Sequence, residues 1–170
     1  MPLFRASRAG SRLVAALFVA ASWSWAAAPP PRAVFDDWRA ACLPDGSCSA
    51  TTARGGGQLR VARPRADASW TITWMPRADL RAGGQLSVRV DGDPPTELAP
   101  DAGFRLLHGG RTVAVTDRRA ADRLLAAMRK GREAEFSYRA GSGDPLHERF
   151  SLAGLTAALN FIAERQPPIR

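Results

Sequence analysis

The sequence contains few of the residues on which enzyme and metal sites usually depend. Its 170 residues include two cysteines, two histidines and one tyrosine. Two cysteines are too few for a disulfide-dense miniprotein or a four-ligand zinc module. With so few histidines and tyrosines, acid–base catalysis has few possible agents.

The signature motifs of common enzyme classes are also missing. The chain has no Gly-x-Ser-x-Gly nucleophile turn, no His-Glu-x-x-His zinc motif and no glycine-rich loop that ends in Lys-Ser or Lys-Thr. Ser142 has a glycine on each side, but it lies in a hairpin-like turn typical of a flexible loop. We therefore predict a protein that is not an enzyme and has no catalytic residue, no metal ligand and no cofactor. One alternative is a hydrolase that uses His108 or His147, which requires a cleft in which a carboxylate reaches the histidine.

The chain has no apolar run that approaches the ~20 residues required to span a bilayer. The apolar run at 13–21 is nine residues long, three arginines precede it, and small residues at 26–28 follow it. This three-part pattern is typical of a secretory signal peptide, so we predict that residues 1–28 form a cleaved leader. The mature protein is expected in the periplasm or outside the cell, without a transmembrane helix.

The composition is that of a globular protein, with 45% hydrophobic and 24% charged residues, and the length allows one domain. We expect an extended tail at 29–34, a single domain at 35–166 and a C-terminal tail at 167–170. Loss of the leader arginines lowers the formal net charge from +8 to +5. Such a surplus attracts anionic surfaces weakly. Because export is predicted, we expect no nucleic-acid partner.

The two cysteines, Cys42 and Cys48, flank a turn sequence, Leu-Pro-Asp-Gly-Ser. In an oxidising compartment, two cysteines across such a turn are expected to form a disulfide. The closed loop is short, so a chain-entropy model gives a stabilisation of about 2–2.5 kcal/mol. The alternatives are a redox-active pair and half of a metal site, which needs His108 or His147 to converge on the cysteines.

Much of the domain alternates apolar and polar residues, a pattern typical of half-buried strands. Strands are predicted at 58–63, 69–74, 85–90, 104–107, 111–116, 133–139 and 146–150. Helical periodicity occurs twice, from the N-cap Asp117 to Gly131 and from Ser151 to Pro167. This order favours an α+β fold, in which a mostly antiparallel β-sheet or sandwich of about eight short strands is covered by two helices.

Basic residues gather on and after the first predicted helix. We interpret them as candidate partner-binding residues for an anionic headgroup or an acidic protein. The set consists of Arg118, Arg119, Arg123, Arg129, Lys130 and Arg132. The alternative interpretation is a solvated helix face in an arginine-rich chain.

Two further features have simpler interpretations than a ligand site. Asp91 and Asp93 offer two carboxylates to a calcium ion, but two acids in a turn are typical turn formers. Trp70 and Trp74 share a strand face with Ile72, and they are expected in the core rather than in a ligand cleft.

The ends of the domain resemble a known family. Trp38 and the two cysteines combine with the block at 151–159, Ser-Leu-Ala-Gly-Leu-Thr-Ala-Ala-Leu, and with the ending Glu-Arg-Gln at 164–166. This combination resembles a domain-of-unknown-function family of exported bacterial proteins related to the invasion-associated locus B (IalB-like) proteins. The resemblance spans most of residues 35–166. It implies a periplasmic or secreted, non-enzymatic protein of unknown activity and offers no catalytic residue to carry over.

These observations support two hypotheses about function. The leading one is an exported periplasmic binding or accessory protein, whose partner is an unknown protein or an anionic envelope component. The alternative is a secreted inhibitor that inserts a loop into a cell-wall or envelope enzyme. The candidate loop is the segment 91–101, because it carries prolines.

Overall fold

The computed structural model describes residues 30–64, 69–139 and 144–166. The predicted leader at 1–28, Ser142 and the predicted tail at 167–170 lie outside the described residues. Within the described ranges the chain forms eleven strands, two α-helices and one short 3-10 helix. The predicted α+β fold with mostly antiparallel strands is confirmed, although the strands number eleven where about eight are predicted.

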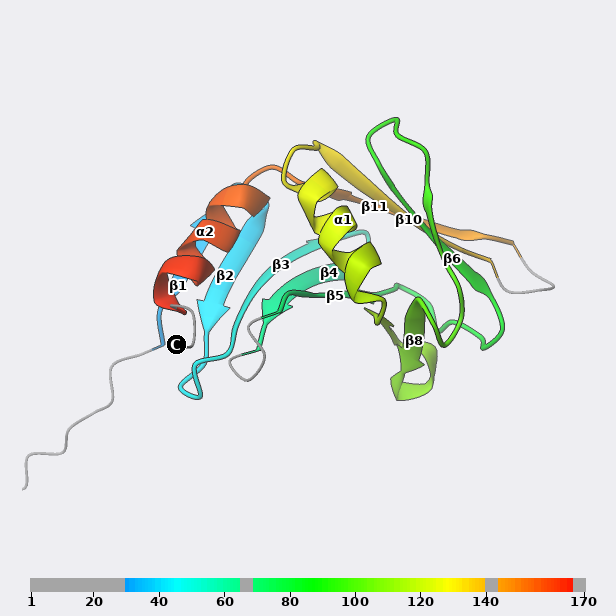
Figure 1. Ribbon diagram of the computed structural model, residues 1–170, viewed down its shortest axis with the longest axis horizontal. Helices are drawn as coiled ribbons and strands as arrows, with labels where there is room; N and C mark the ends of the chain where they lie inside the picture. The colour runs from blue at the N-terminus through cyan, green and yellow to red at the C-terminus, as the bar shows by residue number, and fades with distance from the viewer. Residues whose placement is uncertain (1–29, 65–68, 140–143, 167–170) are drawn as a thin grey trace, which may run out of the picture.

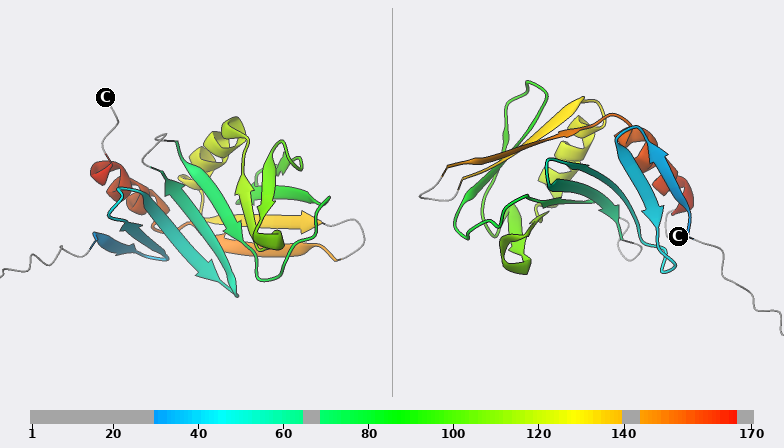
Figure 2. Two further views of the ribbon diagram at one scale, coloured as in Figure 1. Left: turned by 90° about the horizontal axis from the view of Figure 1, so that it is seen from below. Right: turned by 180° about the vertical axis from the view of Figure 1, so that it is seen from behind.

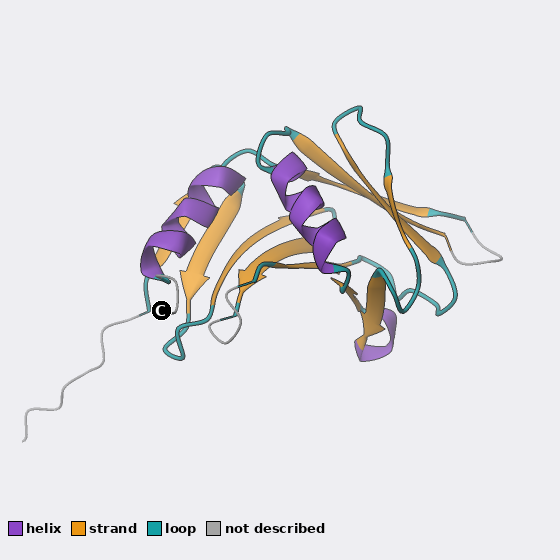
Figure 3. Ribbon diagram, in the orientation of Figure 1, coloured by secondary structure: helices purple, strands orange, loops and turns teal. Residues whose placement is uncertain are grey.

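The strands form two antiparallel sheets (Figure 3). Sheet A has seven strands, in the order β1 (Arg32–Phe35), β2 (Trp38–Cys42), β3 (Cys48–Arg54), β4 (Gly57–Arg63), β5 (Thr71–Met75), β9 (Thr112–Val115) and β8 (Phe104–Leu107). Sheet B has four strands, in the order β11 (Leu146–Ser151), β10 (Glu133–Arg139), β6 (Gln85–Val90) and β7 (Thr96–Leu98). The helices are α1 (Arg118–Met128), α2 (Leu155–Arg165) and the 3-10 helix η1 (His108–Gly110). Among the described helices, none has the length and apolarity needed to cross a membrane.

Both α-helices and sheet B lie on the same side of sheet A (Figure 1). Helix α2 packs over β1, β2 and β3, and α1 packs over β5 and β9 and against sheet B. Sheet A makes an arch, and its other face, which no described element covers, lies on the inside of that arch (Figures 1 and 2). The sheet therefore has one face in the core and one face open to solvent.

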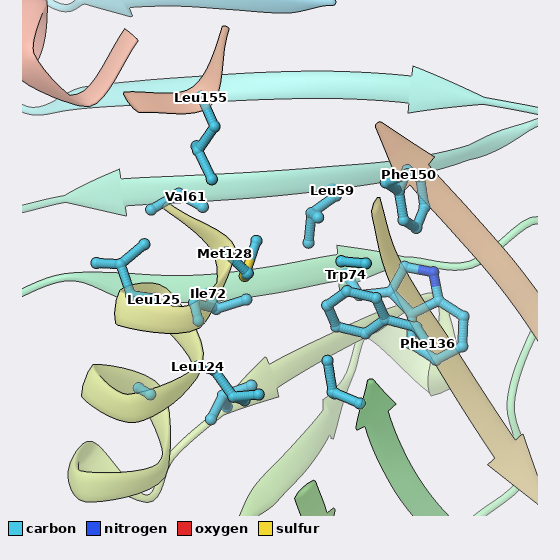
Figure 4. Packing of buried hydrophobic residues seen from close by; sticks show 14 of the residues in the cluster. Leu59, Val61, Ile72, Trp74, Leu124, Leu125, Met128, Phe136, Phe150 and Leu155 are labelled. Carbon is cyan, nitrogen blue, oxygen red and sulfur yellow. The ribbon is translucent and has the colours of Figure 1, made fainter. Parts of the chain in front are cut away.

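The hydrophobic core fills the space enclosed by sheet A, sheet B and the helices. Inward and outward residues alternate along the strands, as the period of two requires. Figure 4 shows side chains of Ile72 and Met128, from β5 and α1, within this core. The rings of Trp74 and Phe136 lie 5.4 Å apart and join the two sheets. The core interpretation is confirmed for Trp74, whereas Trp70 is half-buried and packs against the edge of the same cluster.

Helix α1 begins where the sequence predicts. The carboxylate of Asp117 accepts hydrogen bonds from the backbone N–H groups of Arg119 and Ala120, at 2.9 and 3.2 Å. This side chain therefore caps the helix, because it satisfies two donors that have no partner inside the first turn. The helix ends at Met128, and the basic residues at 129–130 follow its last turn.

Helix α2 begins later than predicted. The predicted first residue, Ser151, is the last residue of β11 and pairs with Glu133 of β10. The helix begins at Leu155, after Gly154, whose φ of +87° lies in the left-handed region. A Cβ at position 154 would lie 2.0 Å from the backbone oxygen of Phe35, so only glycine fits there. The N-cap signal of the serine is outweighed because sheet pairing already satisfies the backbone at that position.

The domain also begins earlier than predicted. Residues 32–34, expected in the extended tail, belong to β1 and pair with β2. The two strands are joined by a tight turn at Asp36 and Asp37, since Phe35 pairs directly with Trp38. The chain therefore enters the domain as an edge strand of sheet A.

Candidate functional site

Cys42 and Cys48 form the predicted disulfide at the end of the β2–β3 hairpin. Both cysteines are buried in the core cluster. Backbone hydrogen bonds close the loop between them, with the N–H of Leu43 donating to the oxygen of Ser47 at 2.7 Å. Across the described residues, no three histidine, cysteine, aspartate or glutamate side chains gather in a way that could hold a metal ion. We therefore interpret the pair as a staple of the hairpin.

Gln166, immediately after α2, holds the disulfide loop to the rest of the domain. Its buried side-chain amide donates to the carbonyl oxygen of Gly46, inside the loop, and to that of Arg63 at 2.9 Å, at the end of β4. The backbone oxygen of Gln166 accepts from the Arg63 guanidinium at 3.1 Å. One residue thus joins the C-terminal helix, the disulfide loop and the end of β4.

Replacing Gln166 by alanine is expected to lower the free energy of unfolding by about 1–3 kcal/mol, because two backbone carbonyls lose their donor. Urea unfolding of the mature chain measures the change. The matched control is Glu164→Ala, an exposed position in the last turn of α2, with an expected change of less than about 0.5 kcal/mol. Equal midpoints for the two variants would contradict the role assigned to Gln166.

The residues that carry the family resemblance meet in space. Trp38 donates from its indole Nε1 to the carbonyl oxygen of Ser151 at 3.0 Å, across 113 positions of the chain. Gly154 lies against the backbone of Phe35, and Leu159 of α2 is fully buried. These contacts interlock the N-terminal hairpin with the C-terminal helix. The residues that carry the resemblance therefore have a structural role, which is to join the N-terminal hairpin to the C-terminal helix.

A buried carboxylate that the sequence analysis did not single out joins the two sheets. Glu148 of β11 is 6% exposed and accepts hydrogen bonds from the indole Nε1 of Trp74 at 2.8 Å and the backbone N–H of Arg77 at 2.7 Å. The Arg77 guanidinium lies 3.9 Å from the same carboxylate. A Cβ at Gly57 would lie 1.9 Å from Oε2, so the carboxylate also occupies the space beside β4. Both oxygens have structural donors, which makes Glu148 a cross-link between sheet B and sheet A.

The strand pattern contains a signal for this residue. Leu146, Glu148 and Phe150 share one face of β11, and the other two are apolar. A carboxylate at an inward position needs partners, because an unpaired buried charge is strongly destabilising. An acidic residue at an inward-facing position of a strand whose other inward-facing residues are apolar is thus the feature that could have identified Glu148.

Among the described residues, His147 has a serine and a carboxylate within reach, but not in the arrangement of a catalytic triad. His147 is exposed on β11, and its Nδ1 is 2.8 Å from Ser137 Oγ and 3.5 Å from Glu135 Oε1. A catalytic triad uses one ring nitrogen for the nucleophile and the other for the orienting carboxylate. Here serine and carboxylate face the same nitrogen, so this cluster does not match that arrangement. His108 is exposed in η1, and its carbonyl oxygen accepts from Arg111 at 3.3 Å.

The predicted partner-binding residues are all exposed, on the outer side of α1 and in the turn that connects it to β10. We call them the α1 basic surface; they are Arg118, Arg119, Arg123, Arg129, Lys130 and Arg132. Within the described residues, no ion pair joins any of them to an acid. Asp122, also exposed, is the acid that α1 carries among them. The cations therefore project into solvent as a group.

Asp91 has a structural role at the edge of this surface. Its Oδ1 accepts hydrogen bonds from the backbone N–H groups of Arg132 and Glu133, each at 2.9 Å. These bonds, with the nearby Arg132 charge, lower the pKa of Asp91 below its usual 3.8. The carboxylate therefore anchors the β6–β7 turn to the start of β10, which supports the interpretation of Asp91 and Asp93 as turn formers.

Comparison with known proteins shows a similarity of fold. No family model matches the chain, and no curated protein matches its sequence. The structure is similar to the crystal structure of invasion-associated protein B from Bartonella henselae, with a TM-score of 0.60 and 20% sequence identity. The alignment covers 80% of this chain and 98% of that chain. The IalB-like relationship suggested by the sequence is thus supported at the level of the fold.

Proposed function

We propose that this IalB-like chain is an exported, non-enzymatic binding or accessory protein that engages an acidic partner through the α1 basic surface. The observation that carries the proposal is the exposure of six cations on one side of the molecule, free of ion pairs within the described residues. Asp91 beside Arg132 and Asp122 on α1 offset part of this charge, and the remaining positive surplus attracts a protein or envelope component of opposite charge.

Two observations support the export and non-enzymatic parts of this proposal. The Cys42–Cys48 disulfide suits an oxidising compartment, as does the leader pattern at 1–28. The arrangement at His147, with Ser137 and Glu135 on one ring nitrogen, argues against acyl-transfer chemistry there.

A second candidate function, inhibition of a cell-wall or envelope enzyme, is favoured by the β6–β7 loop. Residues 91–95 are exposed, and the loop rises at the end of sheet B (Figure 1). It carries Pro94 and Pro95 in succession, which restricts its backbone. Asp91 anchors its base through two backbone donors. A stiff, protruding loop of this kind suits insertion into an enzyme cleft, because less conformational entropy is lost on binding.

One experiment separates the two functions. The mature chain is crosslinked in a periplasmic extract, eluted with a salt gradient and compared with two variants. The first variant combines Arg119→Ala, Arg123→Ala and Lys130→Ala; the second combines Pro94→Gly and Pro95→Gly. Because all five positions are exposed, both variants are expected to keep the native thermal midpoint within a few degrees.

We expect one enriched partner that stays bound at moderate salt. The first variant should no longer capture it, and the second should still capture it. Loss with the loop variant alone would instead favour the inhibitor. If both variants retain the partner, neither surface binds it and the proposal is wrong.

A further inference from the structure

The uncovered face of sheet A has an unusual composition. Apart from the arginines, Gln58 and the half-buried Met75, its outward positions in the central strands carry small or hydroxyl-bearing side chains, namely Ala41, Ser49, Thr51, Ala62, Thr71, Thr73 and Ala114. Such side chains leave the sheet surface open to close approach by a ligand. A protein interface normally centres on large apolar and aromatic residues. On this face the exposed apolar residues Val34 and Leu107 lie on the two edge strands, β1 and β8.

Three arginines stand in one line across this face. The register passes from Arg39 to Thr51, Arg60, Thr73, Ala114 and Arg105 in successive pairs. We call Arg39, Arg60 and Arg105 the arginine row; all three are exposed. Two strand spacings separate the first pair and three separate the second, or about 10 and 14 Å along the sheet. The row therefore crosses the strands at right angles, and a long ligand that contacts all three arginines would lie across the strands.

The charged residues in the strands of sheet A are all of one sign. The sequences of its seven strands contain arginine but no aspartate or glutamate. The strands of sheet B, by contrast, carry four glutamates. No ion pair involving the arginine row occurs within the described residues. The guanidinium groups are thus available to bind carboxylate or sulfate groups, which they recognise with two parallel hydrogen bonds.

A hollow of about 530 Å³ opens on the same face, over the first strands of sheet A. Its lining includes Arg39, the hydroxyl groups of Ser49 and Thr51, and the amide of Gln58. The aspartates at 36–37 also line it, at the β1–β2 turn, so the hollow holds two negative groups as well as Arg39. The hollow offers both charge and neutral hydrogen-bonding groups to a ligand.

We propose that the uncovered face of sheet A binds an extended anionic polysaccharide. Its acid groups pair with the arginine row, and its hydroxyl groups bond to the serine and threonine hydroxyls between the arginines. The inference goes beyond the proposed function, and it rests on that proposal only for export to a compartment that holds such polymers. The surface is distinct from the α1 basic surface, because α1 lies on the opposite side of sheet A.

Other anionic partners fit this face less well. A flat bilayer surface meets a concave face poorly, and this face lies inside the arch (Figure 2). Single-stranded nucleic acid is normally held by stacking on aromatic side chains. The outward positions of sheet A carry none, because Trp38, Trp74 and Phe104 all point into the core. An acidic protein would need an apolar centre that the face lacks.

The test measures binding of oligogalacturonate, a defined polyuronate, to the mature chain by isothermal titration calorimetry. The same oligosaccharide with methyl-esterified acid groups is the uncharged control. Substituting Arg39→Ala, Arg60→Ala and Arg105→Ala together is expected to weaken binding about 100-fold, at roughly fivefold for each lost charge-assisted contact. A long oligomer should bind more tightly than a short one, because only the long one reaches all three arginines.

The matched control removes the same charge from the other surface, through Arg119→Ala, Arg123→Ala and Lys130→Ala. This variant is expected to bind the polyuronate within about threefold of the native chain, because long-range attraction is screened by salt. Asp36→Asn with Asp37→Asn should tighten binding, since two negative charges beside the hollow are removed. Thermal midpoints confirm that all variants are folded.

Three outcomes would overturn the inference. The native chain fails to bind the polyuronate; the two triple variants lose affinity equally, which indicates attraction by net charge alone; or the arginine row binds anionic vesicles or an acidic peptide in preference to the polyuronate. The proposed function has a separate test. It is wrong if the variant of the α1 basic surface still captures the partner in the crosslinking experiment.

Discussion

Replacing Glu148 by alanine is expected to lower the free energy of unfolding by about 2–5 kcal/mol. The carboxylate accepts from Trp74 and from the backbone N–H of Arg77, and it lies at a position that is 6% exposed. Its removal leaves both donors without an acceptor and opens a cavity between β11 and β5. Thermal and urea unfolding of the mature chain measure the loss. The near-ultraviolet signal of the tryptophans should change as well, because Trp74 loses its partner.

Two control variants separate the buried hydrogen bonds from the ion pair. Arg77→Ala removes the guanidinium but keeps the backbone donor. Because the guanidinium is half-exposed and 3.9 Å from the carboxylate, the expected loss is about 1 kcal/mol, smaller than for Glu148→Ala. Glu133→Ala removes an acid whose side chain is 41% exposed, with a similarly small expected change. A Glu148→Ala midpoint equal to that of either control would show that the cross-link contributes little.

Replacing Leu159 by aspartate is expected to unfold the domain. The side chain is fully buried between α2 and sheet A. An aspartate there either buries an unpaired charge or expels the helix, and both cost more than about 4 kcal/mol, a large part of the stability of a small domain. Circular dichroism at ordinary temperature should show loss of native structure, together with a Trp38 environment that becomes exposed.

The control for this variant is on the same helix. Ala157→Asp introduces the same residue on the exposed side of α2 and is expected to change stability by less than about 0.5 kcal/mol. The stability of Leu159→Ala should lie between those of the two aspartate variants, with a loss of about 2–5 kcal/mol in the free energy of unfolding. An unchanged thermal midpoint for Leu159→Asp would refute the placement of α2.

Elements with strong local signals were predicted well. Helix α1 has both its cap, Asp117, and its apolar period in one short segment, and the strands β6, β8 and β10 have the predicted bounds. Strands β1 and β7 were not predicted: β1 follows three prolines, which favour an extended tail, and β7 is only three residues long. The strands beside the disulfide are rich in alanine, serine and threonine, which leaves little apolar alternation to detect.

The candidate sites also fall into those that local sequence identifies and those that depend on residues far apart in the chain. In the α1 basic surface, the arginines at 118, 119 and 123 follow from the helical period, and the cations at 129, 130 and 132 follow from their place just after the helix. The disulfide follows from two cysteines across a turn. The roles of Gln166 and Glu148 were missed, because their partners lie on segments more than 70 positions away.

By itself the sequence determined the α+β class, the disulfide, helix α1 and the family resemblance, since each depends on local patterns, on composition or on matching residue types at given positions. The tertiary structure alone decided which side of sheet A is covered, where α2 begins and which residues share a register row. Arg39, Arg60 and Arg105 are neighbours in that row only because strand pairing aligns them. Register is set by the burial of one face against helices and a second sheet, and those contacts join residues that no local pattern connects.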